Sequence, residues 1–190
     1  MTFSARRDRL LKFTPQCLAA LCTGALERIL PICTHHWSGA YTGCFARCVE
    51  HGWHFAAGDP TAIDRAGADF EEADDLADFY NEDGIGILAD VTTVAVRLIE
   101  VIRSTSPEDA ALAGARAYGN AQSCAAAVNY LGRHENVDLG AEAEEVAWME
   151  SALAALAQAN TPLGGAELLS LGAMPPRWWD RYQKCKHHVI

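Results

Sequence analysis

The strongest constraint on the fold is one apolar stretch near the start of the chain, Pro15–Leu30. Its apolar residues recur at steps of three and four, so a helix would place them on one face. Thr14 is positioned to cap this helix, Pro15 suits its first turn, and Pro31 is expected to end it. The apolar face comprises Leu18, Leu21, Cys22, Ala25, Leu26 and Ile29, and the opposite side Gln16, Ala20, Thr23 and Glu27. Such a helix needs apolar partners, which the rest of the chain must supply.

The same periodicity predicts further helices along most of the chain. We expect them over residues 40–57, 60–80, 85–103, 106–131 and 138–159, with a helical turn or two within 177–186. Gly58 is a C-terminal stop, and Ser106-Pro107 is a helix start. The expected fold is all-α, a single-domain bundle of about six mostly antiparallel helices over residues 1–190. Its core helices lie within 15–159, and a Pro/Gly-rich segment and a basic aromatic tail follow at 160–190.

The composition predicts an acidic cytoplasmic protein. A chain of 190 residues can bury a sizeable core, and its net charge of −10 disfavours nucleic acid and anionic lipid as partners. That charge favours a basic partner, or serves solubility alone. The seven cysteines are an odd number and no signal peptide precedes them, so we expect free, mostly buried thiols in a reducing compartment. No stretch is expected to reach the length of a membrane span, and the oligomeric state stays open.

The helix predicted over residues 60–80 has two sharply different faces. Its buried side is expected to carry Ile63, Ala66, Phe70, Ala73, Ala77 and Tyr80. Its other side carries an acidic stripe of Glu71, Asp75, Asp78 and Glu82, with Asp64, Glu72 and Asp74 at its periphery. Like charges three or four residues apart cost about 0.2–0.5 kcal/mol per pair, and no basic residue interrupts the stripe. The stripe is either a solvated face or a surface for a basic protein partner.

Two magnesium-dependent enzyme functions are alternatives to that interpretation. The segment Asp74-Asp75-Leu76-Ala77-Asp78 matches the Asp-Asp-x-x-Asp pattern with which isoprenoid synthases hold magnesium on a diphosphate. Alternatively, Glu142, Glu144 and Glu145 would pair with Glu71, Glu72 and Asp75, in the manner of all-α nucleotide pyrophosphatases. Short acidic patterns arise readily in an acidic chain, so both remain alternatives to a binding role.

A cysteine and histidine cluster is the second candidate site. Cys44, Cys48 and His51 stand at i, i+4 and i+7 on one helix face, and His35 from the preceding loop could add a fourth zinc ligand. The same positions lie on the predicted core stripe, where cysteine is more often a small apolar residue. We therefore expect no metal and no cofactor.

The C-terminal tail combines basic and aromatic residues, the ingredients of a nucleic-acid patch. These residues are Arg177, Arg181, Lys184 and Lys186 among Trp178, Trp179 and Tyr182. Trp178, Tyr182 and Cys185 share helical spacing, however, which favours a terminal helix that docks onto the bundle.

Two parts of the chain resemble a group of helical bacterial proteins, the YjaG-like family and the related immunity proteins of polymorphic toxin systems. The first part is Cys22–Pro31, with the sequence CTGALERILP. The second runs from Asp74–Tyr80 (DDLADFY) through an apolar helix to Ser106–Asp109 (SPED) and Ala113–Tyr118 (AGARAY). The resemblance covers roughly residues 10–131. It implies an all-α cytoplasmic bacterial protein with no established catalytic residues, which in some relatives neutralises a toxin.

These observations together predict a non-enzymatic protein-binding module. Its most plausible form is an immunity protein, or antitoxin, that covers a basic toxin domain with the acidic stripe. The alternative is a magnesium-dependent enzyme that acts on a diphosphate or nucleotide through Asp74, Asp75 and Asp78.

Overall fold

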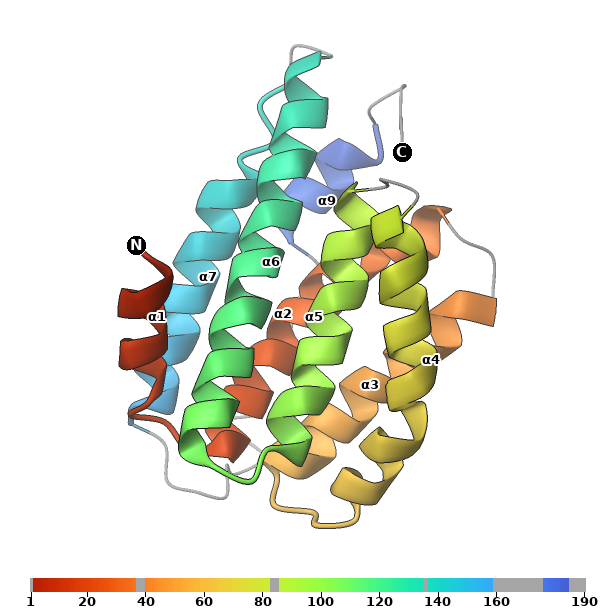
Figure 1. Cartoon of the computed structure of the whole chain (residues 1–190). Helices are drawn as coiled ribbons and strands as arrows, with labels where there is room; N and C mark the ends of the chain where they lie inside the picture. Colours follow the sequence, from red (N-terminus) through yellow and green to blue (C-terminus); the bar gives the residue numbers. More distant parts are fainter. Residues whose placement is uncertain (1, 37–39, 83–85, 135–136, 159–175, 185–190) are drawn as a thin grey trace.

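The computed structural model describes residues 2–36, 40–82, 86–134, 137–158 and 176–184. Eight α-helices account for most of these residues and pack into a bundle (Figure 1). They are α1 (Phe3–Leu10), α2 (Pro15–His36), α3 (Ala40–Ala56), α4 (Ala62–Glu82), α5 (Gly86–Arg103), α6 (Pro107–His134), α7 (Ala141–Leu156) and α9 (Arg177–Tyr182). The predicted all-α class is therefore confirmed. The described helices number eight rather than about six, because α1 and α9 add to the six longer ones.

Two apolar helices, α2 and α5, form the centre of the bundle. Helix α2 packs against α3, α5, α6 and α7, and α5 packs against α2, α3, α4 and α6. The predicted apolar face of α2 is buried throughout. Ala20 and Thr23, expected on its polar side, are also fully buried, because α2 is covered from several directions. The buried hydroxyl of Thr23 donates a hydrogen bond to the Ala19 carbonyl at 2.7 Å.

Local capping signals located most helix ends correctly. The Thr14 hydroxyl accepts from the Cys17 amide at 3.3 Å at the start of α2. The Ser106 hydroxyl accepts from the Asp109 amide at 3.1 Å at the start of α6. Gly58 follows the end of α3 with a φ of 89°, a conformation that glycine adopts without strain.

The N-terminal third differs from the prediction at one helix end and contains one helix that was not predicted. Helix α2 continues through Pro31 to His36, so this proline does not end it. An interior proline removes one backbone hydrogen bond, but continuation buries Ile32 and Cys33 completely, which offsets that loss. Helix α1 was not expected, because it has no apolar period. It is capped by Thr2, whose hydroxyl accepts from the Ala5 amide at 3.3 Å.

Helix α2 also corrects the expectation about membrane-length segments. Its portion Pro15–Thr34 is long and apolar enough to cross a membrane by length and composition alone. Most of that portion is buried among the other helices, and the core helix of a soluble protein passes the same test. The segment is therefore weak evidence for a membrane span.

Candidate functional site: the acidic face of α4

Helix α4 lies at one side of the bundle, where it packs against α3 and α5 and leaves its outer side to solvent (Figure 1). Small residues make its inner side: Ala66, Ala73 and Ala77 are buried, together with Leu76. Phe70 is half-buried beneath the guanidinium of Arg103, which lies 5.1 Å from the ring centre. Ile63 was expected on the buried side but is 41% exposed. This position is the second residue of the helix and lies at the border of the buried stripe. The side chain of Tyr80 lies outside the described residues.

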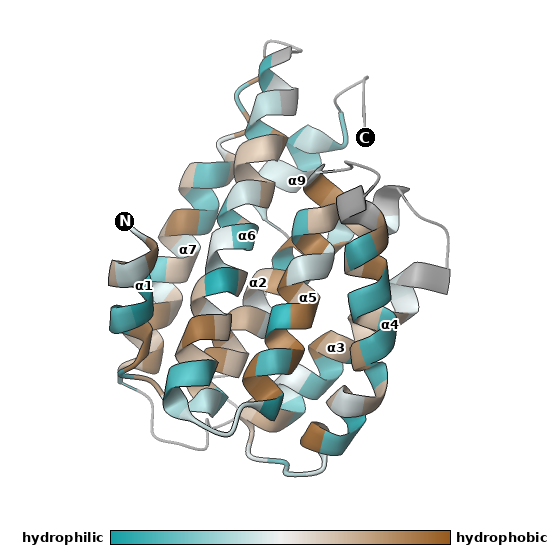
Figure 2. Cartoon of the chain, in the orientation of Figure 1, coloured by the Kyte–Doolittle hydropathy of each residue, from teal (hydrophilic) through white to brown (hydrophobic). Residues whose placement is uncertain are grey.

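The outer side of α4 carries the acidic face, which we define as Asp64, Glu71, Asp75 and Asp78. All four side chains are exposed, and hydrophilic residues follow this side of the helix (Figure 2). Glu82 occupies a position on the same side, but its side chain is outside the described part of the chain. Helix α4 contains eight acidic residues and one basic residue, and its last turn has no basic residue. The carboxylates in the C-terminal half of α4 therefore repel one another. They also interact unfavourably with the negative end of the helix dipole.

The bundle neutralises only the edge of α4 that faces α3. Arg47 of α3 binds Asp69 through Nε at 2.9 Å and Glu72 through Nη2 at 2.6 Å. His51, one turn further along α3, contacts the other Asp69 oxygen through Nε2 at 2.9 Å. Sequence reasoning missed this cluster. The sequence did contain a signal for it. Arg47 and His51 are four residues apart, so they lie on the same face of their helix, next to the residues that face the core.

Among the described side chains, the other carboxylates of α4 lack such a partner. Across the described ranges, no lysine, arginine or histidine lies within ion-pair distance of Glu71, Asp74, Asp75 or Asp78. Glu72, predicted at the periphery of the stripe, is exposed but already paired with Arg47. The structure thus divides the predicted binding residues into a neutralised edge and an unneutralised outer face. Phe79, which follows Asp78, is 54% exposed and adds an aromatic ring to this surface.

The carboxylates proposed to complete a magnesium site do not come together. Helix α7, which carries Glu142, Glu144 and Glu145, lies on the opposite side of the bundle from α4 (Figure 1). In the described part of the chain, no three His, Cys, Asp or Glu side chains are grouped so that they could hold a metal ion. The pairing of these glutamates with Glu71, Glu72 and Asp75 is therefore wrong.

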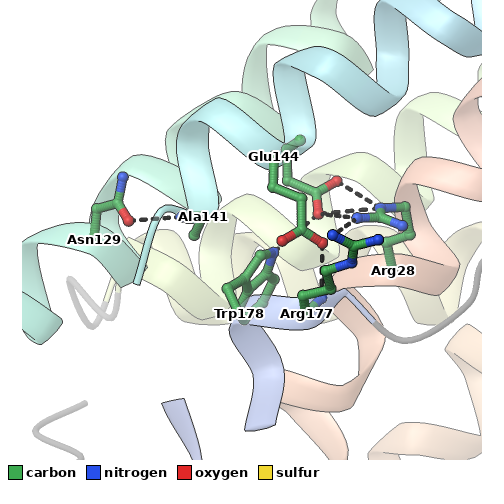
Figure 3. A network of polar contacts seen from close by, with 7 residues as sticks. Arg28, Asn129, Ala141, Glu144, Arg177 and Trp178 are labelled. Carbon is green, nitrogen blue, oxygen red and sulfur yellow. Dashed lines mark hydrogen bonds and ion pairs between the residues drawn. The ribbon is translucent and has the colours of Figure 1, made fainter. Parts of the chain in front are cut away.

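Glu145 and Glu144 instead hold three helices together (Figure 3). Glu145, which is fully buried, accepts from Arg28 of α2 at Nε (2.9 Å) and Nη2 (2.8 Å). It also accepts from the indole nitrogen of Trp178 in α9 at 3.0 Å. Glu144 accepts from Arg28 at 3.3 Å and from the backbone amide of Arg177 at 2.7 Å. The network anchors α9 on the bundle, as the spacing of Trp178 and Tyr182 predicted, and both of these aromatic residues are buried.

The cysteine and histidine cluster is divided between the core and the α3–α4 contact. Cys44 and Cys48 are fully buried, and His51 is turned toward Asp69. A hydrogen bond with Cys44, together with burial, raises the pKa of the Cys48 thiol. The side chain of His35 lies outside the described residues. All six cysteines of the described ranges are free and buried, as expected, and Cys185 lies outside them.

Burial also sets the chemistry of the deeper cysteines. It raises the pKa of Cys22 to about 12 and that of Cys124 well above its ordinary value. A thiol with a raised pKa is a poor nucleophile. These cysteines therefore serve the packing of the core.

Comparisons with known protein families, with curated proteins and with solved structures find no match to this chain. The function is therefore inferred from the geometry and the charge of the surface.

Proposed function

We propose that this protein is a non-enzymatic binding module whose acidic face captures a basic protein partner. The observation that carries the proposal is the outer side of α4, where Glu71, Asp75 and Asp78 are exposed and have no counter-charge within the described residues. Opposite charge on a partner accelerates encounter and sets specificity. The exposed ring of Phe79 supplies an apolar contact of the kind that dominates binding energy when surrounded by polar groups.

The partner class that best fits this surface is a basic toxin domain, with the present chain as its immunity protein. The charge of α4 supports this reading, and so does the resemblance to immunity proteins in Cys22–Pro31 and Asp74–Tyr80. A stripe of repelling carboxylates lowers the stability of the free protein, and a basic surface would relieve that repulsion on binding. The role of the protein is then to cover the toxin's active surface.

The test is to co-express this protein with the product of the adjacent reading frame in a bacterial host. We expect the neighbour to arrest growth, and we expect the wild-type protein to restore it. The variant Glu71→Lys/Asp75→Lys/Asp78→Lys should lose the protection, with a slower association rate for the purified pair. Added salt should weaken the wild-type complex for the same reason.

A second triple variant, Glu108→Lys/Glu142→Lys/Asp180→Lys, changes the net charge equally on other exposed surfaces and should keep the protection. Equal losses in both triple variants would show that overall charge matters rather than α4. A neighbouring product that neither arrests growth nor binds would refute the immunity role. The α4 variant should itself keep its thermal midpoint or raise it slightly. The new lysines repel one another, but they form opposite-charge pairs of about 0.2–0.5 kcal/mol each with Glu72 and Asp74 and suit the negative end of the helix dipole.

A further inference from the structure

An open groove of about 510 Å³ is lined by residues of α1, α6 and the start of α7. Helices α1 and α7 lie on the side of the bundle away from α4 (Figure 1). The volume of the groove falls in the range of small-molecule sites. Two guanidinium groups, from Arg6 and Arg116, line it together with the amide of Gln122 and the carboxylate of Glu142. Phe3 forms an apolar wall and is 46% exposed.

The guanidinium of Arg6 is held in a fixed position by neutral groups. It lies 4.5 Å from the ring centre of Tyr118. Its Nη1 donates to the Ala115 carbonyl at 3.3 Å, and its Nη2 donates to Gln122 Oε1 at 2.7 Å. Gly119 makes this position possible, because a Cβ there would lie 2.7 Å from Nη1. The cation is thus pre-positioned at the wall of the groove.

The charge of Arg6 is not balanced by any carboxylate of the described residues. Burial lowers the pKa of Arg6, and the nearby Tyr118 hydroxyl partly opposes this effect. Several other arginines of the described residues are paired with carboxylates, among them Arg9 with Glu150 at 2.7 Å and Arg28 with Glu145 at 2.8 Å. Arg116, the second cation of the groove, is exposed and likewise has no carboxylate within ion-pair distance among the described residues.

A partly buried cation without a counter-ion is costly, and an anion from solution can offset that cost. We propose that this groove binds a small anionic molecule, whose carboxylate or phosphate group contacts Arg6 and Arg116 and whose apolar part packs on Phe3. A groove lined by two arginines suits an oxyanion with several acceptor oxygens. The site is separate from the acidic face of α4 and does not depend on the proposed partner.

The experiment is a titration of the ¹⁵N-labelled full chain, followed by NMR chemical shifts, with inorganic phosphate, acetate and phenylacetate at constant ionic strength set by chloride. We expect saturable shifts in Ala115, Gly119 and the Arg6 Nε–H, with a dissociation constant at or below about 10 mM. Tighter binding of phosphate would identify a phosphorylated ligand. Tighter binding of the carboxylates would identify a carboxylic acid, and phenylacetate should then bind more tightly than acetate because of Phe3. Shifts that rise linearly with every anion would overturn the proposal.

Three variants separate this site from a general effect of charge. Arg116→Gln should weaken binding by about tenfold, whereas Arg133→Gln, an exposed arginine of α6 outside the groove, should leave it unchanged. Gly119→Ala keeps every charge and favours helix, but displaces the Arg6 guanidinium, so it should also weaken binding. Equal effects of Arg116→Gln and Arg133→Gln, or unchanged affinity in Gly119→Ala, would refute the assignment.

Discussion

Replacement of Glu145 by glutamine is the most demanding test of the buried network that joins α2, α7 and α9. Glutamine preserves the shape of the side chain and can still accept from Trp178, but it leaves the Arg28 guanidinium without its principal carboxylate. Arg28 is 6% exposed, so water cannot take the place of the lost charge. Removal of one partner from a buried ion pair costs about 3–5 kcal/mol. Glu144 still contacts Arg28 at 3.3 Å, which places the expected loss near the lower end of that range, about 3 kcal/mol.

Urea unfolding, followed by far-UV circular dichroism and tryptophan fluorescence, measures this loss directly. A loss of about 3 kcal/mol is a large share of the stability of a typical domain. It should lower the thermal midpoint by about 10 °C for a chain of this size. Glu144→Gln is the matched control. The Glu144 side chain is 26% exposed, so its replacement should cost only about 1 kcal/mol.

A double variant decides whether the cost arises from the unpaired charge. Arg28→Met/Glu145→Gln removes both charges, keeps side chains of similar volume and retains an amide oxygen that can accept from the Trp178 indole, so no buried charge loses its partner. We expect the double variant to recover most of the stability that Glu145→Gln loses. A Glu145→Gln variant as stable as the wild type would refute the reasoning. So would a double variant no more stable than the single one.

Two further predictions concern other buried positions. Gly52→Ala would place a Cβ 2.0 Å from the Thr23 hydroxyl oxygen, where α2 and α3 approach most closely, so we expect a loss of about 1–3 kcal/mol in urea unfolding. The added replacement Thr23→Ala should recover part of that loss, and a stable Gly52→Ala single variant would contradict the packing. Asp90→Asn should raise the free energy of unfolding at neutral pH but not in acid. Burial raises the pKa of Asp90 above its unfolded value, so its ionised form destabilises the fold increasingly as pH rises through the window between the two values. The hydrogen bond from the Asn120 amide, 3.0 Å long, can persist in the variant. Identical pH profiles of unfolding for the two proteins would show that Asp90 does not have this effect.

The helices of this protein could be predicted from the sequence because their signals are short-range. A cap such as Thr14 or Ser106 acts within three residues, and the apolar period of α5 acts within a few turns. The same kind of signal failed for Pro31. There a local rule against proline competed with the burial of Ile32 and Cys33, and burial depends on the packing of helices that are distant in sequence.

The candidate site, too, could be predicted from the sequence only in part. Amphipathic spacing alone predicted that Glu71, Asp75 and Asp78 lie on the outer side of α4, and the structure exposes all three. Whether those charges are neutralised could not be read from the spacing, because the relevant cations belong to another helix. Only the docking of α3 showed that Arg47 pairs with Asp69 and Glu72, while the outer face finds no counter-charge within the described part of the chain.

The buried network and the groove were decided by tertiary structure alone. Arg28 and Glu145 are separated by 117 positions in sequence, and Arg6 and Gln122 by 116. No periodicity relates residues at such separations. Sequence therefore determined which faces each helix would bury, because that depends on neighbours one turn away. The partner of each buried or half-buried charge was settled only when the helices packed, because electrostatic pairing acts through space and not along the chain.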